Sequence, residues 1–392
     1  MIKRSLSVQL EKFLNHRKSI LLLGPRQVGK TTLLKTLSNA HYFSLAKPSI
    51  RLQYEKDPSR LEREVEALRR DQHQSSQPLL IVIDEIQKVP GLMDSIQDLI
   101  DEKVAQFILT GSSARKLKKS GQINLLPGRV ISLRMDPLSL NEFSDRSLEE
   151  HLLDGDLPAI VLENDKEIRS HLLQSYVESY LEEEVKSEAL VRGIGPFARF
   201  LELAAIEAGR IANFSNLSKE VGPSVHTIMN YYEVLVDCLI AERIEPLTES
   251  LTRKKLTKSP KFLFFDMGVR RIAAHEGTHL IPERMGELFE QWIGLELIRM
   301  IRNLSHPGAL HFWRDADGPE VDWVLKTDEK LIPIEVKWTD SPTKREGRHL
   351  ETFLNEYPKA TQGFIVCRTP RTQQISEKIK SIPWQELEQV LR

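Results

Sequence analysis

Residues 19–32 read Ser-Ile-Leu-Leu-Leu-Gly-Pro-Arg-Gln-Val-Gly-Lys-Thr-Thr, and they decide the fold of the first third of the chain. Residues 19–23 read as a buried strand, because the uninterrupted apolar run at residues 20–23 is typical of a strand covered on both faces in a parallel sheet. Residues 24–31 match the pattern GxxxxGK[ST] and lead into a helical pattern that ends near Leu37. A glycine-rich turn in this position directs backbone N–H groups at a phosphate, and the helix N-terminus adds its positive dipole end. We therefore predict a nucleoside triphosphate site, with Lys30 on the β- and γ-phosphates and Thr31 on Mg²⁺.

A second apolar run, residues 79–83, ends in the acidic pair Asp84 and Glu85. Asp84 is expected to hold Mg²⁺ through water, and Glu85 is expected to polarise the water that attacks the γ-phosphate. A hydrophobic run followed by two acids is a weak signal by itself, but the upstream glycine-rich loop makes it a strong one.

Two further features of the first third are candidates for sensing or completing the nucleotide site. The strand at residues 107–113 (FILTGSS) ends in small polar residues, and Thr110, Ser112 or Ser113 either senses the γ-phosphate or marks an ordinary strand-to-loop turn. Arg129 is either an arginine finger on a neighbouring subunit's ATP or a surface arginine. The predicted ATP-binding residues are Gly24, Pro25, Arg26, Gln27, Val28, Gly29, Lys30, Thr31, Thr32, Asp84, Thr110 and Ser112.

The length and composition of the chain limit its class. With 392 residues, two or three domains are expected, and 40% hydrophobic with 28% charged residues is typical of a soluble globular protein. The net charge of -1 means that binding to nucleic acid would depend on local basic patches. The two cysteines, Cys238 and Cys367, lie in apolar runs without a CxxC neighbour, which disfavours a disulfide scaffold and a thiolate metal site. No apolar run approaches the length of a membrane span, so we expect a cytoplasmic protein without a membrane partner.

Alternating strands and helices predict a doubly wound α/β domain over residues 1–145, followed by a helical region over residues 146–280. In that region, residues 216–247 contain a short helix, a turn at Gly222 and Pro223, and a second helix. Two strands joined by the basic segment 251–261 follow, so the pattern predicts a winged helix. Thr227 and Asn230 are expected to face DNA while Val225 packs inward. The predicted DNA contacts are Thr227, Asn230, Arg253, Lys254, Lys255 and Lys258, with Lys261 on the same wing.

Residues 281–392 have the pattern of a small α/β domain with an acidic hairpin. Asp322 lies on one strand, and Glu335 and Lys337 share one face of the next strand because side chains alternate along a strand. Carboxylates on neighbouring strands hold Mg²⁺, or Mn²⁺ as an alternative, and a lysine beside them orients water or stabilises phosphate charge. A cross-strand salt bridge on a solvated face is the competing interpretation.

The sequence resembles the AAA-like bacterial and archaeal P-loop ATPases over essentially its whole length. The resemblance lies in GPRQVGKTT, IDEIQ, LTGSS, the Gly-Arg pair before PLSLNEF, and KFLFFDMGV. It implies an AAA-type ATPase with Thr110 or Ser112 near the sensor position, Arg129 as an inter-subunit residue, and assembly into a homo-oligomer, with a hexameric ring as one form. In this family a domain of unknown function follows the ATPase domain.

The acidic hairpin resembles the core of the PD-(D/E)XK nucleases, and the expected fold is therefore restriction-endonuclease-like. That resemblance implies catalytic roles for Asp322, Glu335 and Lys337 and for an acid on the preceding helix. Glu290 fits this acid, with Glu287 as a substitute. The sequence departs from the nuclease pattern at Val321, where the family name has proline.

Three functional hypotheses follow. The first is a DNA-processing enzyme, in which an ATPase is coupled to a metal-dependent nuclease domain. The second is an ATP-dependent DNA-binding switch or motor whose nuclease-like domain is inert. The third is a signalling ATPase that does not bind DNA. A basic cluster at residues 115–119 either faces solvent or, in a ring, lines a channel.

Overall fold

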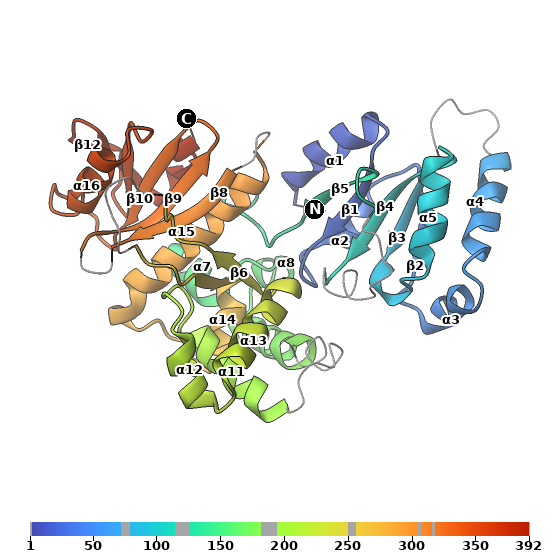
Figure 1. Ribbon diagram of the computed structural model, residues 1–392, viewed down its shortest axis with the longest axis horizontal. Coiled ribbons are helices and arrows are strands. Elements are labelled where there is room, and N and C mark those ends of the chain that lie inside the picture. Colours follow the sequence, from blue (N-terminus) through green and yellow to red (C-terminus); the bar gives the residue numbers. More distant parts are fainter. Residues whose placement is uncertain are drawn as a thin grey trace. The chain divides into compact units, whose positions relative to one another are not determined.

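The computed structural model describes residues 2–71, 79–113, 126–181, 194–249, 256–304, 308–315 and 318–391. The chain forms two compact units (Figure 1). The first contains Met1–Leu138 and Val234–Ile240, and the second contains Ser139–Glu233 and Ala241–Arg392. The predicted three-domain division at residues 145 and 280 stays a prediction. Residues 115–119, Arg253, Lys254 and Lys255 lie outside the described residues.

The first unit is built on a five-stranded sheet in the order β2-β3-β4-β1-β5, and every strand pair is parallel. The predicted α/β sheet is therefore confirmed. Its strands are β1 (Ser19–Leu23), β2 (Ala40–Ser44), β3 (Leu79–Asp84), β4 (Ala105–Gly111) and β5 (Val130–Arg134). The helices around it are α1 (Leu6–Asn15), α2 (Lys30–Leu34), α3 (Pro48–Lys56), α4 (Arg60–Asp71), the 3₁₀ turn η1 (Ile86–Lys88) and α5 (Leu92–Asp101).

Apolar side chains on both faces of this sheet are buried, which explains why its strands read as continuous apolar runs. Leu21 packs with residues of α4 and α5, whereas its neighbours Ile20 and Leu22 are fully buried on the opposite face. Because the strands are parallel, their carboxyl ends meet at one edge of the sheet. The glycine-rich loop, Asp84 and Thr110 all lie at that edge.

The first part of the second unit is helical, as predicted. It contains α7 (Leu148–Asp154), α8 (Pro158–Val161), α9 (Lys166–Tyr176), the π-helical turn η2 (Val177–Leu181), α11 (Ile194–Ile206), α12 (Phe214–Val221), α13 (Val225–Asp237), β6 (Ala241–Ile244), β7 (Lys261–Phe264) and α14 (Met267–Ala273). Local signals fix several helix starts, since Ser147 and Glu150 form a capping box on α7 and Asp266 caps α14. Aromatic rings of α11 and α13 pack together, with Phe200 and Tyr232 at a centroid distance of 4.9 Å.

The helix–turn–helix and hairpin elements are present at α12, α13, β6 and β7. Gly222 ends α12 at a φ of 103°, a backbone conformation that favours glycine. The expectation that Val225 packs inward is wrong, because this side chain is 39% exposed. Val225 is the first residue of α13, and the helix first turns inward at Ile228, which is fully buried.

The second unit ends in a six-stranded mixed sheet in the order β12-β13-β11-β10-β9-β8. Its elements are the 3₁₀ turn η3 (Pro282–Arg284), α15 (Met285–Arg302), β8 (Gly308–Arg314), β9 (Glu320–Thr327), β10 (Leu331–Val336), α16 (Arg348–Glu356), β11 (Gly363–Cys367), β12 (Gln373–Ser376), β13 (Ile379–Pro383) and η4 (Trp384–Leu391). Strand β9 pairs antiparallel with both β8 and β10, and β10 pairs parallel with β11.

One helix covers each face of this sheet, and alternation along β9 divides its side chains between them. Trp323 belongs to the core under α15, whereas Val324 belongs to the core under α16. Gly294 allows α15 to approach closely, because a Cβ there would lie 2.6 Å from Trp323 Cζ2. This packing fixes the position of Asp322, one residue before Trp323.

A buried network of charges ties the helical part of the second unit to α15. Asp156 accepts from Arg299 at 2.9 Å and lies 2.6 Å from His151 Nδ1, and Glu296 lies 2.5 Å from the same guanidinium. Burial alone would raise the pKa of Asp156, but His151 and Arg299 hold it below its usual range. Burial, and then the charge of Asp156, raises the pKa of Asp266 to about 6. Pairing of these charges permits their burial.

Candidate functional sites

The glycine-rich loop connects β1 to α2, and two of its glycines are required by their surroundings. A Cβ at Gly24 would lie 2.3 Å from the carbonyl oxygen of Met135, so no other residue fits without backbone movement. Gly29 has a φ of 99°, in the left-handed region. The strand, turn and helix around residues 24–31 are therefore the context that a phosphate-binding loop needs.

Lys30 lies inside the loop that it follows. Its ammonium donates to the carbonyl oxygens of Gly24 at 2.6 Å and Pro25 at 2.7 Å, and the side chain is buried. The ammonium charge is therefore held by the carbonyl oxygens of the loop. Val28 is fully buried, so its predicted contact with a nucleotide can involve only its backbone. Thr32, in the first turn of α2, is exposed.

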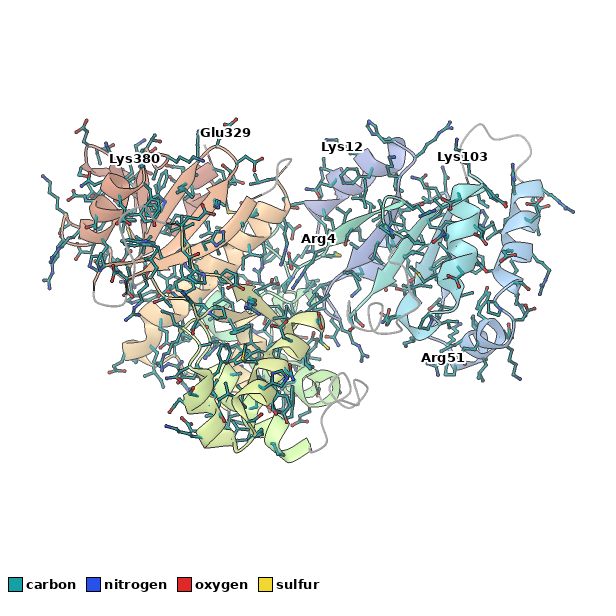
Figure 2. The ribbon with its side chains drawn as sticks, viewed as in Figure 1. Arg4, Lys12, Arg51, Lys103, Glu329 and Lys380 are labelled. Carbon is teal, nitrogen blue, oxygen red and sulfur yellow. The ribbon has the colours of Figure 1, made fainter. Side chains whose placement is uncertain are left out.

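Arg4, labelled in Figure 2, contacts the backbone of this loop. Its guanidinium donates to the carbonyl oxygens of Val28 and Asp136, both at 2.6 Å, and of Pro137 at 3.3 Å. No motif predicts this role, because a single arginine outside a recognised pattern is usually a surface residue. Arg4 links the glycine-rich loop to the segment that follows β5.

Asp84 is the centre of a cluster of hydroxyl groups. Thr31 donates to its Oδ2 at 3.2 Å, which brings the loop and the end of β3 together as predicted from the two stretches. Thr110 donates to Oδ1 at 2.5 Å, and the Tyr42 hydroxyl also donates to Oδ2. Sequence reasoning missed Tyr42. The one signal for it was that a tyrosine falls in the predicted strand at residues 42–45, and no motif connects that strand with Asp84.

Glu85 follows Asp84 in a left-handed conformation with a φ of 65°. Its backbone N–H donates to the Thr110 hydroxyl at 3.0 Å. Gln87, which sequence reasoning also missed, donates through Nε2 to Glu85 Oε2 at 2.6 Å and to Ser112 Oγ at 3.1 Å. The predicted residues Glu85, Thr110 and Ser112 thus belong to one hydrogen-bonded group at the carboxyl ends of β3 and β4.

Arg129 forms a two-pronged ion pair with Asp101, at 2.6 and 2.8 Å, within the first unit. The hydrogen bond that the guanidinium donates to Asp101 raises the pKa of Arg129 above its usual value. The role of Arg129 as an inter-subunit finger stays a prediction, and in that role it would have to exchange Asp101 for a phosphate.

Asp322, Glu335 and Lys337 meet at the junction of β9 and β10, as the hairpin predicts. Lys337 Nζ lies 2.6 Å from Glu335 Oε1 and 3.8 Å from Asp322 Oδ2. The backbone N–H of Val336 also donates to Asp322 Oδ2, at 2.8 Å. The salt bridge of the competing interpretation is therefore present, but its two carboxylates are buried and do not lie on a solvated face.

Glu290 on α15 belongs to the same electrostatic group. Its backbone carbonyl accepts from Trp323 Nε1 at 3.1 Å, which ties this turn of α15 to β9. Burial, and then the charge of Asp322, raises the pKa of Glu290 to about 7. Glu287, which the sequence offered as an alternative to Glu290, instead lies 3.2 Å from Arg210.

Lys261 is a member of this site that sequence reasoning assigned elsewhere. Its ammonium lies 2.8 Å from Glu290 Oε1 and over the rings of Phe312 and Trp323, at 5.1 and 4.8 Å. The expectation that Lys261 meets phosphates from the wing is not supported by these contacts, because its charge is paired with Glu290.

Two observations bear on a metal at this site. Glu335 Oε2 is buried and has no hydrogen-bond partner, which is costly unless a ligand or ion completes it. Burial, and then the charge of Asp322, raises the pKa of Glu335 well above its usual value, against the opposing charge of Lys337. However, no group of three or more His, Cys, Asp or Glu side chains in the described part of the chain is arranged to hold a metal ion.

The predicted DNA contacts are only partly described. Asn230 and Lys258 are exposed. Thr227 is half-buried, and its hydroxyl lies 2.9 Å from that of Ser224, which caps the start of α13. The Thr227 side chain therefore serves the helix N-terminus in this structure.

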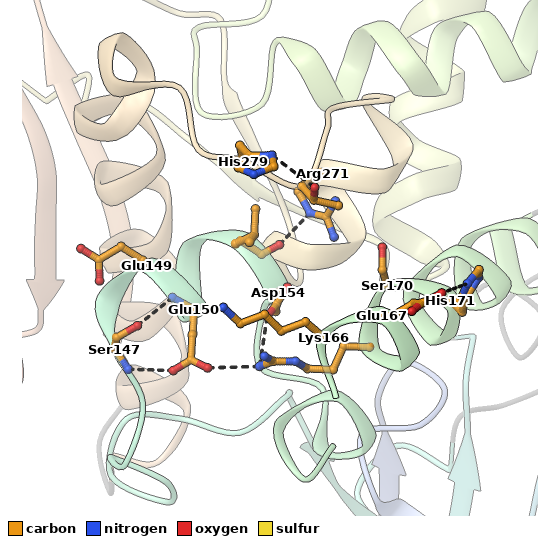
Figure 3. Close-up of a pocket in the computed structure, with 13 residues that line it drawn as sticks. Ser147, Glu149, Glu150, Asp154, Lys166, Glu167, Ser170, His171, Arg271 and His279 are labelled. Atoms are coloured by element: carbon orange, nitrogen blue, oxygen red, sulfur yellow. Dashed lines mark hydrogen bonds and ion pairs between the residues drawn. The ribbon is translucent and has the colours of Figure 1, made fainter. Parts of the chain in front are cut away.

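The second unit also contains a pocket of about 680 Å³ between α7, α9 and the segment after α14 (Figure 3). Its charged side chains are largely paired with one another. Arg169 contacts Glu150 and Asp154 at 3.2 and 3.1 Å, and Arg271 donates to the carbonyl oxygen of Leu153 at 2.8 Å. These pairs stabilise the helical packing around the pocket.

Comparison with known families agrees with the glycine-rich loop and its acidic partner. Residues 16–144 match the model of an AAA domain. This part of the chain is an AAA-like ATPase domain. Residues 145–279 and 285–387 match two domains of unknown function, DUF8612 and DUF4143. The AAA domain supports nucleotide-dependent activity, typically with Mg²⁺.

Curated relatives align with most of the chain. Uncharacterized proteins of Mycobacterium bovis and Mycobacterium tuberculosis are each 24% identical over 343 residues, which cover 87% of this chain and 75% of theirs. An uncharacterized protein of Methanocaldococcus jannaschii is 22% identical and covers 97% of this chain and 86% of its own.

Similar solved structures include C. elegans PCH-2, at 18% identity and a TM-score of 0.24, covering 33% of this chain and 38% of that one. Drosophila ORC bound to AT-rich DNA and Cdc6 is 10% identical, with a TM-score of 0.26 and coverage of 68% and 88%. Pif1 helicases at forked double-stranded DNA are 15% identical, with a TM-score of 0.25 and coverage of 45% and 51%. These scores are too low to establish a shared overall fold. Across the described ranges, no helix has both the length and the apolar character needed to cross a membrane.

Proposed function

We propose that the AAA domain binds ATP with Mg²⁺ and hydrolyses it to ADP and phosphate. The observation that carries this proposal is the hydrogen bond of 3.2 Å between Thr31 and Asp84, which joins the glycine-rich loop to the acidic end of β3. Lys30, Thr31 and Asp84 are the residue types that hold a triphosphate and its Mg²⁺ in P-loop enzymes.

Each residue has a distinct role in this proposal. Lys30 leaves the carbonyl oxygens of Gly24 and Pro25 and contacts the β- and γ-phosphates. Thr31 and Asp84 would hold Mg²⁺, which when bound neutralises charge that develops on the phosphates. Glu85 accepts a proton from, or orients, the attacking water, and Gln87 holds its carboxylate in position through the contact of 2.6 Å.

Measuring phosphate release from ATP in the Lys30→Ala variant tests the assignment of the hydrolytic site to the glycine-rich loop. The Lys35→Ala variant is the control. Lys35 follows the last residue of α2 and is exposed, so its removal takes one lysine from the opposite end of the same helix, away from the loop. We expect wild-type turnover in Lys35→Ala and loss of turnover in Lys30→Ala. Equal turnover in the two variants would assign hydrolysis to another site or to a contaminant.

For the second unit we propose metal-dependent hydrolysis of DNA at the group of Asp322, Glu335 and Lys337. The buried, unpartnered Glu335 Oε2 supports this proposal, because one more ligand or ion is needed to satisfy it. Asp322 and Glu335 would hold the divalent ion, which when bound activates water and stabilises charge on a phosphodiester. Lys337 orients that water or contacts the phosphate.

A DNA-binding switch with an inert C-terminal domain is the alternative. Two observations favour it: the carboxylates are already paired with Lys337, and the three-carboxylate arrangement expected of a metal cluster is not found in the part of the chain that the structure describes. Nicking of duplex, branched and single-stranded DNA with Mg²⁺ or Mn²⁺ separates the two. Cleavage lost in Asp322→Ala supports the nuclease, whereas DNA binding without cleavage supports the switch.

In either form, we propose that DNA contacts α13 through Asn230 and the hairpin through Lys258, both of which are exposed. We also propose a homo-oligomer in which Arg129 approaches a neighbouring nucleotide, and a cytoplasmic location. The salt dependence of DNA affinity in Lys258→Ala, compared with the wild type, tests the first proposal because each lost phosphate contact lowers the salt slope.

A further inference from the structure

Tyr42 is a hydroxyl donor at the nucleotide site that neither motif accounts for. It lies on β2, and its hydroxyl reaches Asp84 Oδ2 at the end of the adjacent strand β3. The phenol is the donor of this hydrogen bond, because an ionised carboxylate only accepts.

Hydroxyl groups occupy both oxygens of the Asp84 carboxylate. Oδ2 accepts from Tyr42 and from Thr31, and Oδ1 accepts from Thr110 at 2.5 Å. Asp84 is only 6% exposed, so these donors compensate a buried charge. Mg²⁺ usually keeps several of its waters, and an aspartate that holds it through water must accept a hydrogen bond from one of them. A hydroxyl on Oδ2 and a metal-bound water compete for the same oxygen.

We propose that the Tyr42 hydroxyl competes with a Mg²⁺-bound water for Oδ2 of Asp84, and that it leaves this oxygen when Mg²⁺ and nucleotide bind. This inference rests on the proposed ATP-binding function of the same site. Tyr42 is thus a positioning residue, which holds the Asp84 carboxylate through its hydrogen bond at the expense of Mg²⁺ affinity.

The place of Tyr42 in the sheet allows this exchange. Strand β2 is at the edge of the sheet, and Tyr42 is half-buried and lies outside the apolar core that its neighbours Phe43 and Leu45 join. Side chains alternate along a strand, so Tyr42 points away from that core. Rotation of this side chain away from Asp84 leaves the core packing intact.

Binding of ADP at increasing Mg²⁺ concentration, followed by calorimetry, tests the proposal without relying on turnover. Tyr42→Phe removes the competing hydroxyl and little else. Because a hydrogen bond to a charged group is involved, we expect the Mg²⁺ concentration at half-saturation to fall by about tenfold. ADP binding in EDTA should match that of the wild type.

Tyr54→Phe is the matched control. Tyr54 also donates to a carboxylate, Glu64 Oε2 at 2.6 Å, but it lies on α3 and has no contact with Asp84. This variant should keep the wild-type Mg²⁺ midpoint, and thermal melts of both variants would show that the domain is folded.

The outcomes separate this inference from the function on which it rests. If the wild-type protein binds ADP more tightly in Mg²⁺ but the Mg²⁺ midpoint of Tyr42→Phe is unchanged or raised, the role of Tyr42 is wrong. The proposed ATP site is unaffected by that result. Wild-type protein that binds no ADP in either condition would overturn the proposed function and this inference with it.

Discussion

Replacing Lys337 with methionine should destabilise the C-terminal sheet in a pH-dependent way. Asp322 and Glu335 are 7% and 3% exposed, and Lys337 Nζ is the cation 2.6 Å from Glu335 and 3.8 Å from Asp322. Breaking a buried ion pair costs about 3–5 kcal/mol. Because the lysine side chain is 36% exposed, water compensates part of the loss, and we expect about 2–3 kcal/mol near pH 8.

The sign of the pH dependence follows from Glu335. Its pKa in the folded protein is already raised, first by burial and then by Asp322, and removal of Lys337 raises it further. A carboxyl group with a raised folded pKa destabilises the protein above that pKa, and the penalty is relieved as pH falls and the group is protonated. The difference in free energy of unfolding between the wild type and Lys337→Met should therefore become smaller as the pH falls from 8 toward 5.

Tryptophan fluorescence during urea unfolding measures this effect selectively. All five tryptophans, Trp292, Trp313, Trp323, Trp338 and Trp384, lie in the last third of the chain. The control is Lys326→Met, which removes a lysine paired with Glu249 at 2.7 Å on the exposed side of β9. Surface pairs contribute about 0–1 kcal/mol, so this variant should stay close to the wild type. A Lys337→Met protein as stable as Lys326→Met at pH 8 would refute the reasoning.

The remaining predictions concern three other positions. Gly24→Ala should unfold more readily and lose ADP binding, because its Cβ would lie 2.3 Å from a backbone oxygen, whereas Gly91→Ala, with no atom within 4 Å, should behave as wild type in thermal melts and ADP titrations. Glu290→Gln should flatten the pH dependence of the free energy of unfolding between about pH 4.5 and 7. In the wild type, a Glu290 pKa raised from 4.5 to about 7 lowers this free energy by up to ~3 kcal/mol as the pH rises through that range. A pH dependence in EDTA that is the same in the variant and the wild type would contradict the assignment. Arg4→Met should lower the melting temperature of the AAA domain, because it removes the hydrogen bonds to the buried carbonyl of Val28, at about 1–3 kcal/mol, and to the part-buried carbonyl of Asp136. A melt like that of the wild type would exclude the supporting role.

Much of the fold was predictable because local patterns and packing agree. Residues 20–23 are apolar without alternation because β1 lies between β4 and β5 and is covered on both faces. Asp322 and Glu335 could be paired in advance because β9 and β10 are consecutive antiparallel strands. In the hairpin, neighbours in sequence are also neighbours in space, whereas β1 could be predicted from its own apolar residues although its partners β4 and β5 are distant in sequence.

The features that were missed depend on contacts between distant segments. Arg4 reaches Asp136, Lys261 reaches Glu290, and Tyr42 reaches Asp84, and no spacing rule predicts such pairs. Lys261 illustrates the difficulty, because a basic segment on a hairpin suggests phosphate binding until the fold brings one of its lysines to a buried acid. Val225 was misplaced for a related reason, since helical periodicity does not show where a helix begins.

The central claim is that Lys30, Asp84 and Glu85 form an ATP-hydrolysing site, and single-turnover hydrolysis by Glu85→Gln tests it most directly. The glutamine can keep the hydrogen bond from Gln87, so the fold of η1 should be preserved. We predict that ATP binding remains, while the rate of hydrolysis falls by about 10²–10⁴-fold, the usual contribution of a general base. ATP hydrolysis at the wild-type rate in Glu85→Gln, with the protein folded and ATP bound, would contradict the account.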